Sequence, residues 1–314
     1  MPGPGVKERG CYHHCFHGTV TAMDAVRRHY ESYPYPHYPL VASVRRKDTR
    51  HLHLASLWAS YNGTQLPPEA GGILIAGCGS FAPYPFSLAN PGYPITALDL
   101  SATNIRRARL HCLLHLRRNV RFIVGDLLDP SVAPGPFSFI DAYGVLHHLV
   151  HPLDGLLSLK KRLAGNGLLR LMLYSHGARS GTEAARRAVR RLKIHTPHAL
   201  RRMARTLPKD SRLAAHLHAA PDGTADSGLA DAFLHPQVTT YRVAELAALI
   251  GASGLELLAF CHPDAADDPA MEWRRLEERE AQGTLDTNYV LLLRCPTASL
   301  PASTPDIPAT TMCK

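Results

Sequence analysis

The feature that most constrains the fold is a short apolar run that ends in a glycine-rich turn. Residues 73–76 (ILIA) are continuously apolar, and residues 77–79 (GCG) follow at once. An unbroken apolar run of this length is typical of a strand buried on both faces of a parallel sheet, and glycines permit a tight turn directly after it. A second strand is expected at residues 95–99 (ITALD) and ends in an acid, Asp99, twenty residues after Gly79. The interval fits one helix, which predicts a βαβ unit.

The alternation of strands and helices continues well beyond this first unit. Ser101 is expected to cap a helix that runs to about Leu116, and Pro152 to open another that ends at 163, before glycines 165 and 167. A further helix is expected over residues 243–250. The remaining strands are expected at 120–124, 139–143, 168–174, 255–260 and 289–293. The pattern predicts an α/β protein with a seven-stranded, mostly parallel sheet and helices on both faces.

The chain divides into a core and several attached segments. An arm (21–70) contains Tyr33-Pro34-Tyr35-Pro36, which predicts an extended path from Ala25 to Tyr38, and a helix over 51–61 that Asn62-Gly63 ends. Insertions beside the carboxyl ends of the strands usually cover the ligand crevice, so residues 176–240 are interpreted as a helical substrate lid. The expected segments are a disordered tail (1–20), the arm (21–70), the core (71–175), the lid (176–240), the C-terminal part of the core (241–295) and a second disordered tail (296–314).

Composition limits the environment and the partners. No apolar run is long enough to cross a bilayer and no secretory signal is recognisable, so a cytoplasmic location is expected. The seven cysteines are odd in number and scattered, which favours reduced thiols. Cys11 and Cys15 lie among histidines but lack a second ligand pair at zinc spacing, so no metal site is predicted. The net charge of +9 comes with an excess of Arg over Lys that a GC-rich genome also produces, and by itself it decides little.

The glycine turn and Asp99 together indicate a ligand of the adenosine type. Backbone N–H groups at Gly77 and Gly79 can approach a ligand closely, and a carboxylate at the end of the second strand can accept hydrogen bonds from ribose hydroxyls. Gly77, Gly79 and Ala82 also fit a loose dinucleotide fingerprint, so NAD must be considered. Asp126 after the third strand, placed to meet an adenine amino group, and the segment 143–149 (YGVLHHL) argue against NAD.

These motifs, in this order and spacing, resemble the class I S-adenosylmethionine-dependent methyltransferases. The matching pieces are ILIAGCG (73–79), ALDLS (97–101), GDL (125–127) and VLHHL (145–149), within residues 70–175. The resemblance implies a Rossmann-like core with S-adenosyl-L-methionine as cofactor. The cofactor-binding residues that it implies are Gly77, Cys78, Gly79, Ser80, Asp99, Leu100, Asp126, Leu127 and Tyr143. The chain departs from the pattern at Ile75, where an acid often contacts the methionine ammonium group, and at Phe81, where a third glycine is usual. We expect Phe81 or Tyr84 to stack near the cofactor.

The candidate catalytic and substrate residues come from loops at the same edge of the sheet. Methyl transfer needs alignment and exclusion of water, and a base only where the acceptor arrives protonated. His147 and His148 are the candidate bases because imidazole titrates in the right range; one of them is alternatively a structural histidine. The candidate substrate residues are Tyr33, Tyr35, Tyr174, His176 and Arg179, and Arg179 is placed to hold a carboxylate or phosphate.

Three functions remain open from the sequence. The first is methylation of a nitrogen or oxygen of a small metabolite, with no membrane partner and an undetermined oligomeric state. The second is methylation of tRNA or rRNA, because an arginine-rich helix at 183–194 places Arg186, Arg187 and Arg190 opposite an apolar face. Aromatic stacking residues are absent there, which favours a solvated surface. The third is a non-catalytic S-adenosylmethionine-binding protein, suggested by Ile75 and Phe81.

Overall fold

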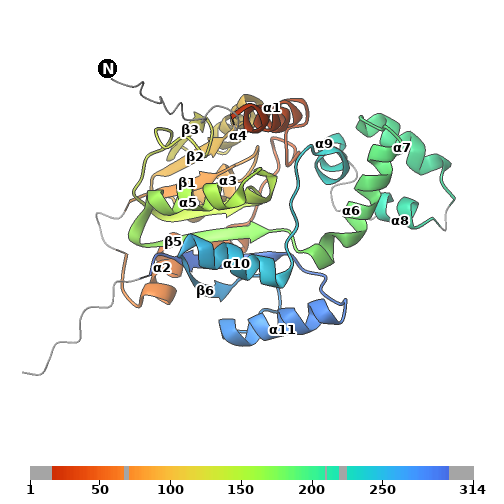
Figure 1. Cartoon of the computed structure of the whole chain (residues 1–314). Coiled ribbons are helices and arrows are strands. Elements are labelled where there is room, and N and C mark those ends of the chain that lie inside the picture. Colours follow the sequence, from red (N-terminus) through yellow and green to blue (C-terminus); the bar gives the residue numbers. More distant parts are fainter. Residues whose placement is uncertain (1–15, 67–70, 209–210, 219–224, 297–314) are drawn as a thin grey trace, which may run out of the picture.

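A single seven-stranded sheet forms the centre of the protein (Figure 1). The computed structural model describes residues 16–66, 71–208, 211–218 and 225–296. The strand order is β3-β2-β1-β4-β5-β7-β6, and only β7 runs antiparallel to its neighbours. The strands are β1 (Ile73–Ala76), β2 (Ile95–Asp99), β3 (Val120–Val124), β4 (Phe137–Tyr143), β5 (Leu163–Leu173), β6 (Glu256–Phe260) and β7 (Tyr289–Arg294). The predicted seven-stranded, mostly parallel sheet is therefore confirmed.

Helices cover both faces of this sheet, and each face has its own apolar cluster. The first face packs against η1 (Arg46–Leu52), α2 (Leu54–Asn62), α3 (Pro83–Ala89) and α4 (Ala102–Leu114). The second face packs against α5 (Pro152–Arg162), α10 (Val243–Ser253) and α11 (Pro269–Ala281). Within the described part of the chain, no helix is both long and apolar enough to pass through a bilayer.

The chain reverses its direction across the sheet between β1 and β4. From β1 it proceeds outward through β2 to β3, and then returns to place β4 on the other side of β1. The loops after β1 and β4 therefore diverge, and they leave a crevice at the carboxyl ends of the strands. In open α/β sheets such a crevice is where ligands bind.

Two predicted boundaries are wrong. Strand β5 begins at Leu163, directly after α5, and includes glycines 165 and 167; the strand starts early because Leu163 pairs with Phe137 before the register shifts. Helix α1 (Phe16–Ser32) occupies part of the expected tail and of the expected extended arm. Met23, Val26 and Tyr30 have the spacing of one helical face, and the prolines that would prevent a helix begin only at 34. The remaining tail residues, with Cys11 and Cys15, lie outside the described residues, as do 297–314.

The described residues between 176 and 240 form a helical lobe beside the sheet, as Figure 1 shows. The lobe consists of α6 (His176–Arg191), α7 (Pro197–Thr206), α8 (Arg212–His218), α9 (Asp226–Leu229) and η3 (Ala230–Leu234). It has a small apolar core of its own around Val189, Leu200 and Phe233. The prediction that Arg186 lies on an exposed basic face is wrong. Its guanidinium is buried, because η3 folds back and the His235 carbonyl accepts from Nη2 at 2.7 Å.

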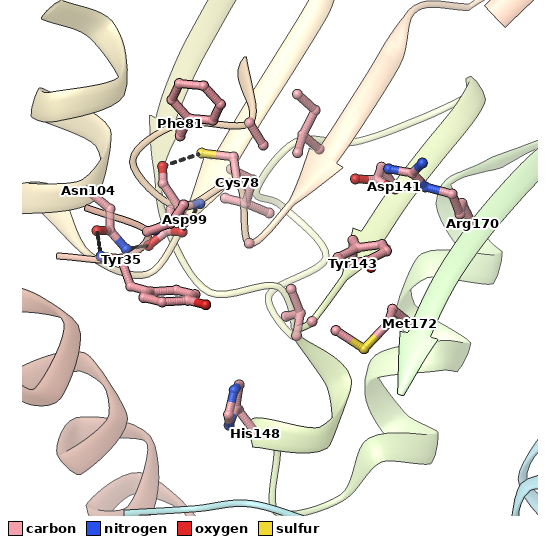
Figure 2. A pocket seen from close by; sticks show the side chains of 18 of the residues that line it. Tyr35, Cys78, Phe81, Asp99, Asn104, Asp141, Tyr143, His148, Arg170 and Met172 are labelled. Atoms are coloured by element: carbon pink, nitrogen blue, oxygen red, sulfur yellow. Dashed lines mark hydrogen bonds and ion pairs between the residues drawn. The ribbon is translucent and has the colours of Figure 1, made fainter. Parts of the chain in front are cut away.

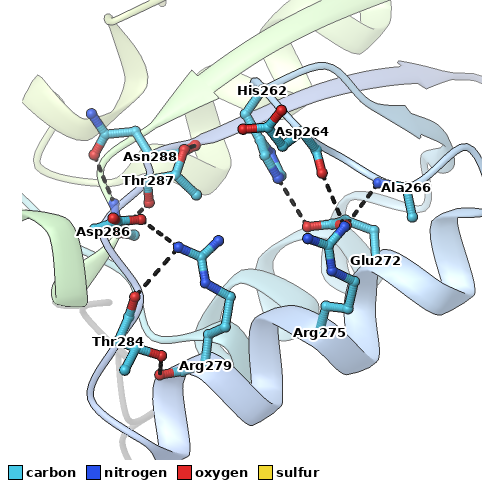
Figure 3. Close-up of polar contacts among 11 residues, drawn as sticks. His262, Asp264, Ala266, Glu272, Arg275, Arg279, Thr284, Asp286, Thr287 and Asn288 are labelled. Atoms are coloured by element: carbon cyan, nitrogen blue, oxygen red, sulfur yellow. Dashed lines mark hydrogen bonds and ion pairs between the residues drawn. The ribbon is translucent and has the colours of Figure 1, made fainter.

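A buried carboxylate fixes the loop between β6 and α11 (Figure 3). Glu272 accepts hydrogen bonds from His262 Nε2 at 3.0 Å, the Ala266 N–H at 2.8 Å and Arg275 Nη1 at 3.0 Å. Burial raises its pKa, but these hydrogen bonds and charges outweigh burial and hold the pKa below the ordinary value. The loop held in this way carries Cys261 and Pro263 to the cavity described next.

Candidate active site

The loop after β1 contains two glycines that no other residue can replace without strain. Gly77 and Gly79 have φ values of +68° and +57°, a region that L side chains rarely adopt. A Cβ atom at Gly77 would lie 2.3 Å from Cγ2 of Val145, and one at Gly79 would lie 2.6 Å from the carbonyl oxygen of Tyr35. The loop after β1 therefore packs closely against the loop after β4 on one side and against the arm on the other.

Asp99 links this loop to the start of α4. Its carboxylate accepts hydrogen bonds from the Gly79 N–H at 2.7 Å, the Ser101 N–H at 2.9 Å and Asn104 Nδ2 at 3.2 Å. Burial raises the pKa of Asp99, and the bonds from Ser101 and Gly79 oppose that shift. Asn104 Oδ1 in turn accepts from the Tyr35 N–H at 3.1 Å, so the arm belongs to the same network.

A cavity of about 850 Å³ lies at the carboxyl ends of β1, β2 and β4. The arm contributes Tyr35 to its wall, α1 contributes Tyr30 and η3 contributes Asp231, so segments far apart in the sequence enclose it. Figure 2 shows Asp99 and Tyr35 on one side of the cavity, Asp141 and Arg170 on another, and His148 at one end. This volume is within the range of pockets that hold cofactors or small molecules.

The charge of the cavity is opposite to that of the whole protein. The charged residues lining it are four carboxylates and one guanidinium: Asp99, Asp126, Asp141, Asp231 and Arg170. The chain as a whole carries +9. A wall with excess negative charge favours a cationic ligand such as a sulfonium and disfavours the pyrophosphate of a dinucleotide.

Comparison with known proteins identifies the domain around this cavity. Residues 74–171 match the family model described as a methyltransferase domain. The chain therefore carries a methyltransferase domain over these residues. The methyltransferase domain includes β1 to β4 and most of β5, with every loop that the sequence motifs occupy. The family that the sequence resembles is therefore confirmed.

Two relatives extend the similarity beyond the methyltransferase domain. An uncharacterized protein of Synechococcus (syc1184_c) is 30% identical over 257 residues, which cover 78% of this chain and 61% of that protein. The solved structure of PKMT2 from Rickettsia typhi in complex with AdoHcy has a TM-score of 0.60 at 16% identity, and the match covers 84% of this chain and 55% of that one. The chain thus spans somewhat more than half the length of these relatives, and the second likeness shows a shared fold.

Most of the residues expected to bind the cofactor line the cavity of the methyltransferase domain. They are Gly77, Cys78, Gly79, Asp99, Leu100, Asp126, Leu127 and Tyr143. Ser80 does not line it: its side chain is buried and donates to the carbonyl of Pro36, while its N–H donates to the Tyr35 carbonyl at 3.0 Å. Ser80 therefore holds the arm. Phe81 lines the cavity, whereas Tyr84 is buried against His111 and His115.

The two candidate bases have different surroundings. His147 is completely buried, stacks on Tyr174 with ring centroids 3.8 Å apart, and is outside the cavity lining. His148 lines the cavity, and its Nδ1 lies 2.8 Å from the Gln237 carbonyl. A carbonyl only accepts, so Nδ1 carries the hydrogen and Nε2 has the lone pair. Burial lowers the pKa of His148 to about 4, so the ring is neutral at pH 7.

The five candidate substrate residues separate into two groups. Tyr35 and Tyr174 line the cavity, but Tyr33, His176 and Arg179 do not. Tyr33 packs against His29 on α1, and His176 is exposed at the start of α6. The Arg179 guanidinium lies 4.0 Å above the Tyr174 ring, which is a cation–π contact behind the cavity wall.

Among the cavity residues that sequence reasoning missed, Tyr30 and Asp231 come from segments far apart in the chain. The Tyr30 hydroxyl donates to Asp231 Oδ1 at 3.1 Å, and this bond joins α1 to η3. Tyr30 follows Met23 and Val26 at helical spacing, which is a usable sign that it shares their face. Nothing local marks Asp231, because the pair is separated by 201 positions in the chain.

Asp231 also lies beside two histidines, and their ligand atoms are within 4.8 Å of one another. His235 Nδ1 accepts the Gln237 N–H at 3.1 Å, so in the neutral ring Nε2 carries the hydrogen and has no lone pair for a cation. Arg186 further disfavours a cation, since its charge lowers the pKa of both His29 and His235, although burial is the larger cause. The group is better described as neutral imidazoles packed around one carboxylate.

Proposed function

We propose that this protein is an S-adenosylmethionine-dependent methyltransferase that acts on a nitrogen or an acidic oxygen of a small molecule. The observation that carries the proposal is one cavity in which the glycine loop and Asp99 share walls with Tyr30, His148, Tyr174 and Asp231. The acceptor would enter the part bounded by α1 and the lobe, where Tyr30, His148 and Tyr174 give aromatic walls.

The residues of the cavity fit the cofactor. Asp99 has four lone-pair sites, and the protein uses three of them, which leaves one on Oδ2 for a ribose hydroxyl. The Asn104 bond, at 3.2 Å, is the longest and the one that a second hydroxyl would displace. Asp126 would accept from the adenine amino group through Oδ2, because Oδ1 already accepts the Leu128 N–H at 2.8 Å. When bound, the cofactor supplies an electrophilic methyl group on a positively charged sulfur.

His148 would remove the acceptor's proton through Nε2. Since its pKa is about 4, it is a weak base, too weak to deprotonate an aliphatic alcohol with useful driving force. It can take the proton of a group of similar acidity, such as the ammonium group formed when an aromatic amine nitrogen gains a methyl group, or a carboxylic acid. This supports a nitrogen or acidic oxygen as the acceptor atom. Tyr30 keeps its proton, because burial and then Asp231 raise its pKa well above 10.

Calorimetry with S-adenosylhomocysteine tests the cofactor assignment. Asp99→Asn is expected to weaken binding about 10- to 100-fold, the effect of a lost charge-assisted hydrogen bond. Asp154→Asn is the matched control, because Asp154 is exposed on α5, away from the cavity. An unmodified protein that does not bind S-adenosylhomocysteine would overturn the proposal.

A library of amines, phenols and carboxylic acids tests the reaction itself. Release of S-adenosylhomocysteine with any acceptor separates an enzyme from a non-catalytic binding protein. His148→Gln is expected to slow turnover about 100-fold while affinity for the cofactor is kept, since general-base catalysis contributes roughly that factor. His198→Gln, on the exposed start of α7, is the control.

An RNA acceptor is the less supported alternative. Arg187 and Arg190 are exposed on α6, but Arg186 is engaged inside the lobe and is not free for phosphate contacts. If RNA were the acceptor, charge reversal of Arg187 and Arg190 would abolish a steeply salt-dependent association. Unchanged turnover of a small acceptor by that double variant is the result we expect.

A further inference from the structure

An ion pair crosses the sheet beside the cofactor loop, and the sequence motifs do not include it. Arg170 on β5 donates from Nε to Asp141 Oδ1 on β4 at 2.6 Å, and both side chains are nearly buried and line the cavity (Figure 2). The two residues are register partners, and Asp141 is also the register partner of Ile75 on β1. Lateral neighbours in a sheet point to the same face, so all three lie on the face covered by α2 and α3.

The pair has hydrogen-bonding capacity that the described protein does not use. Arg170 donates only through Nε, so Nη1 and Nη2 have no hydrogen-bond partner among the described residues, and neither does Asp141 Oδ2. None of these atoms is among the fully buried unpartnered ones, so they remain accessible from the cavity. The guanidinium is held in place between Phe86 and Tyr143, whose ring centroids lie 5.7 and 5.3 Å from Cζ.

A buried ion pair is costly to form. Removing both charges from water costs several kcal/mol per ion, and well-packed apolar residues would stabilise the sheet equally well. Two free donors beside one free carboxylate oxygen are, however, complementary to a ligand that carries both a carboxylate and an ammonium group, which is the chemistry of an α-amino acid. Ile75, the neighbour on β1, offers neither charge.

We propose that Asp141 and Arg170 bind the amino-acid end of S-adenosylmethionine. Asp141 accepts a hydrogen bond from the ammonium group of the ligand, and Arg170 donates hydrogen bonds to its carboxylate. This inference rests on the proposed cofactor. Asp99 on β2 and Asp141 on β4 are separated by two strand spacings, about 10 Å across the sheet. Because Leu98 pairs with Ala76 and Asp141 pairs with Ile75, they are also offset by two residues, about 7 Å, along the strands, which gives about 12 Å between their Cα atoms. The ligand chain from ribose C3′ to the amino nitrogen has seven bonds, which extend over about 9 Å at ordinary bond lengths. With a hydrogen bond of about 2.8 Å at each end, one ligand molecule can reach both carboxylates.

Three related ligands separate the roles of the two side chains by calorimetry. S-adenosylhomocysteine has both charged groups, its decarboxylated analogue keeps only the ammonium group, and 5′-methylthioadenosine has neither. Arg170→Met is expected to weaken S-adenosylhomocysteine about 10- to 100-fold and to remove its advantage over the decarboxylated analogue. Asp141→Asn is expected to remove the advantage of the decarboxylated analogue over 5′-methylthioadenosine. Binding of 5′-methylthioadenosine should change less than about twofold in either variant.

The matched control is a similar pair on the same sheet. Glu256 and Arg294 are register partners on β6 and β7 and form an ion pair at 2.8 Å, outside the cavity lining. Arg294→Met should leave the order and the ratios of all three affinities unchanged. If Arg170→Met does not fold, Arg170→Lys keeps the charge and should retain part of the preference for the carboxylate.

The outcomes are distinguishable from failure of the proposed function. If the unmodified protein binds all three ligands but the variants weaken them equally, or not at all, the assignment of Asp141 and Arg170 is wrong and the cofactor assignment stands. If the unmodified protein binds none of the three, the proposed function fails, and this inference fails with it.

Discussion

Lowering the pH from 7.5 to 5 should destabilise this protein strongly through its buried histidines. His29 and His148 lie near one another where α1, η2 (Leu146–His148) and the lobe meet, and burial lowers the pKa of each to about 4 from an ordinary value of 6.5. At pH 5 the unfolded chain binds a proton at each of these positions, and the folded protein does not. Stability is therefore complete above pH 6.5 and is lost as the pH falls toward 4.

The size of the effect follows from the two pKa values. For one histidine, the unfolded chain binds more protons than the folded protein between pH 7.5 and 5. Integrated over this interval, that difference lowers the free energy of unfolding by about 2 kcal/mol. His29 and His148 together give about 4 kcal/mol as an upper figure, because their charges interact. A domain of ordinary stability has roughly 5–15 kcal/mol in total, so this loss is large.

Urea unfolding followed by circular dichroism at both pH values measures the loss, since urea adds no ionic strength. His148→Gln should lose about 2 kcal/mol less than the unmodified protein over this interval, whatever its own stability at pH 7.5. His198→Gln, an exposed position on α7, should follow the unmodified protein. If His148→Gln and the unmodified protein lose equal stability, His148 is not buried in its neutral form, and the argument is refuted.

Three further predictions concern stability. Gly77→Ala should lower the free energy of unfolding by about 3 kcal/mol through left-handed strain and steric overlap, whereas Gly63→Ala, with similar φ and open space, should lower it by about 1 kcal/mol. Arg186→Met should lower it by about 3 kcal/mol, and Arg187→Met by less than about 0.5, both measured by urea unfolding. Glu272→Gln should lower it by about 2 kcal/mol and increase proteolysis near residue 264. Equal effects within either matched pair, or an unchanged Glu272 variant, would contradict these assignments.

The strands of the core were predictable because their signals are local. The expected limits of β1, β2 and β3 are those observed, since a short, mainly apolar run followed by glycine or an acid specifies both the strand and the turn after it. Strand β5 was not predictable at its start. Glycines 165 and 167 signal a break, and only the pairing of Leu163 with Phe137 on β4 overrides that signal.

The remaining errors concern residues whose surroundings come from distant segments. The pattern of α6 alone assigns Arg186 to the solvent side, and its burial depends on carbonyl groups of η3 and the residue after it. Asp231 enters the cavity because α1 and η3 meet there. Such contacts depend on how the lobe folds back, which the periodicity of a single helix does not encode.

Position 79 has a consequence for any transfer of this domain to another protein. The space that a side chain would fill at Gly79 is taken by the backbone of the arm, whose Tyr35 carbonyl would lie 2.6 Å from a Cβ atom. A methyl group at position 79 would overlap with the arm in its observed position. A shortened version that begins near residue 71 would therefore lose one side of its ligand chamber. Alanine at position 79 would then carry only the left-handed backbone strain, about 1 kcal/mol, without the overlap with the arm.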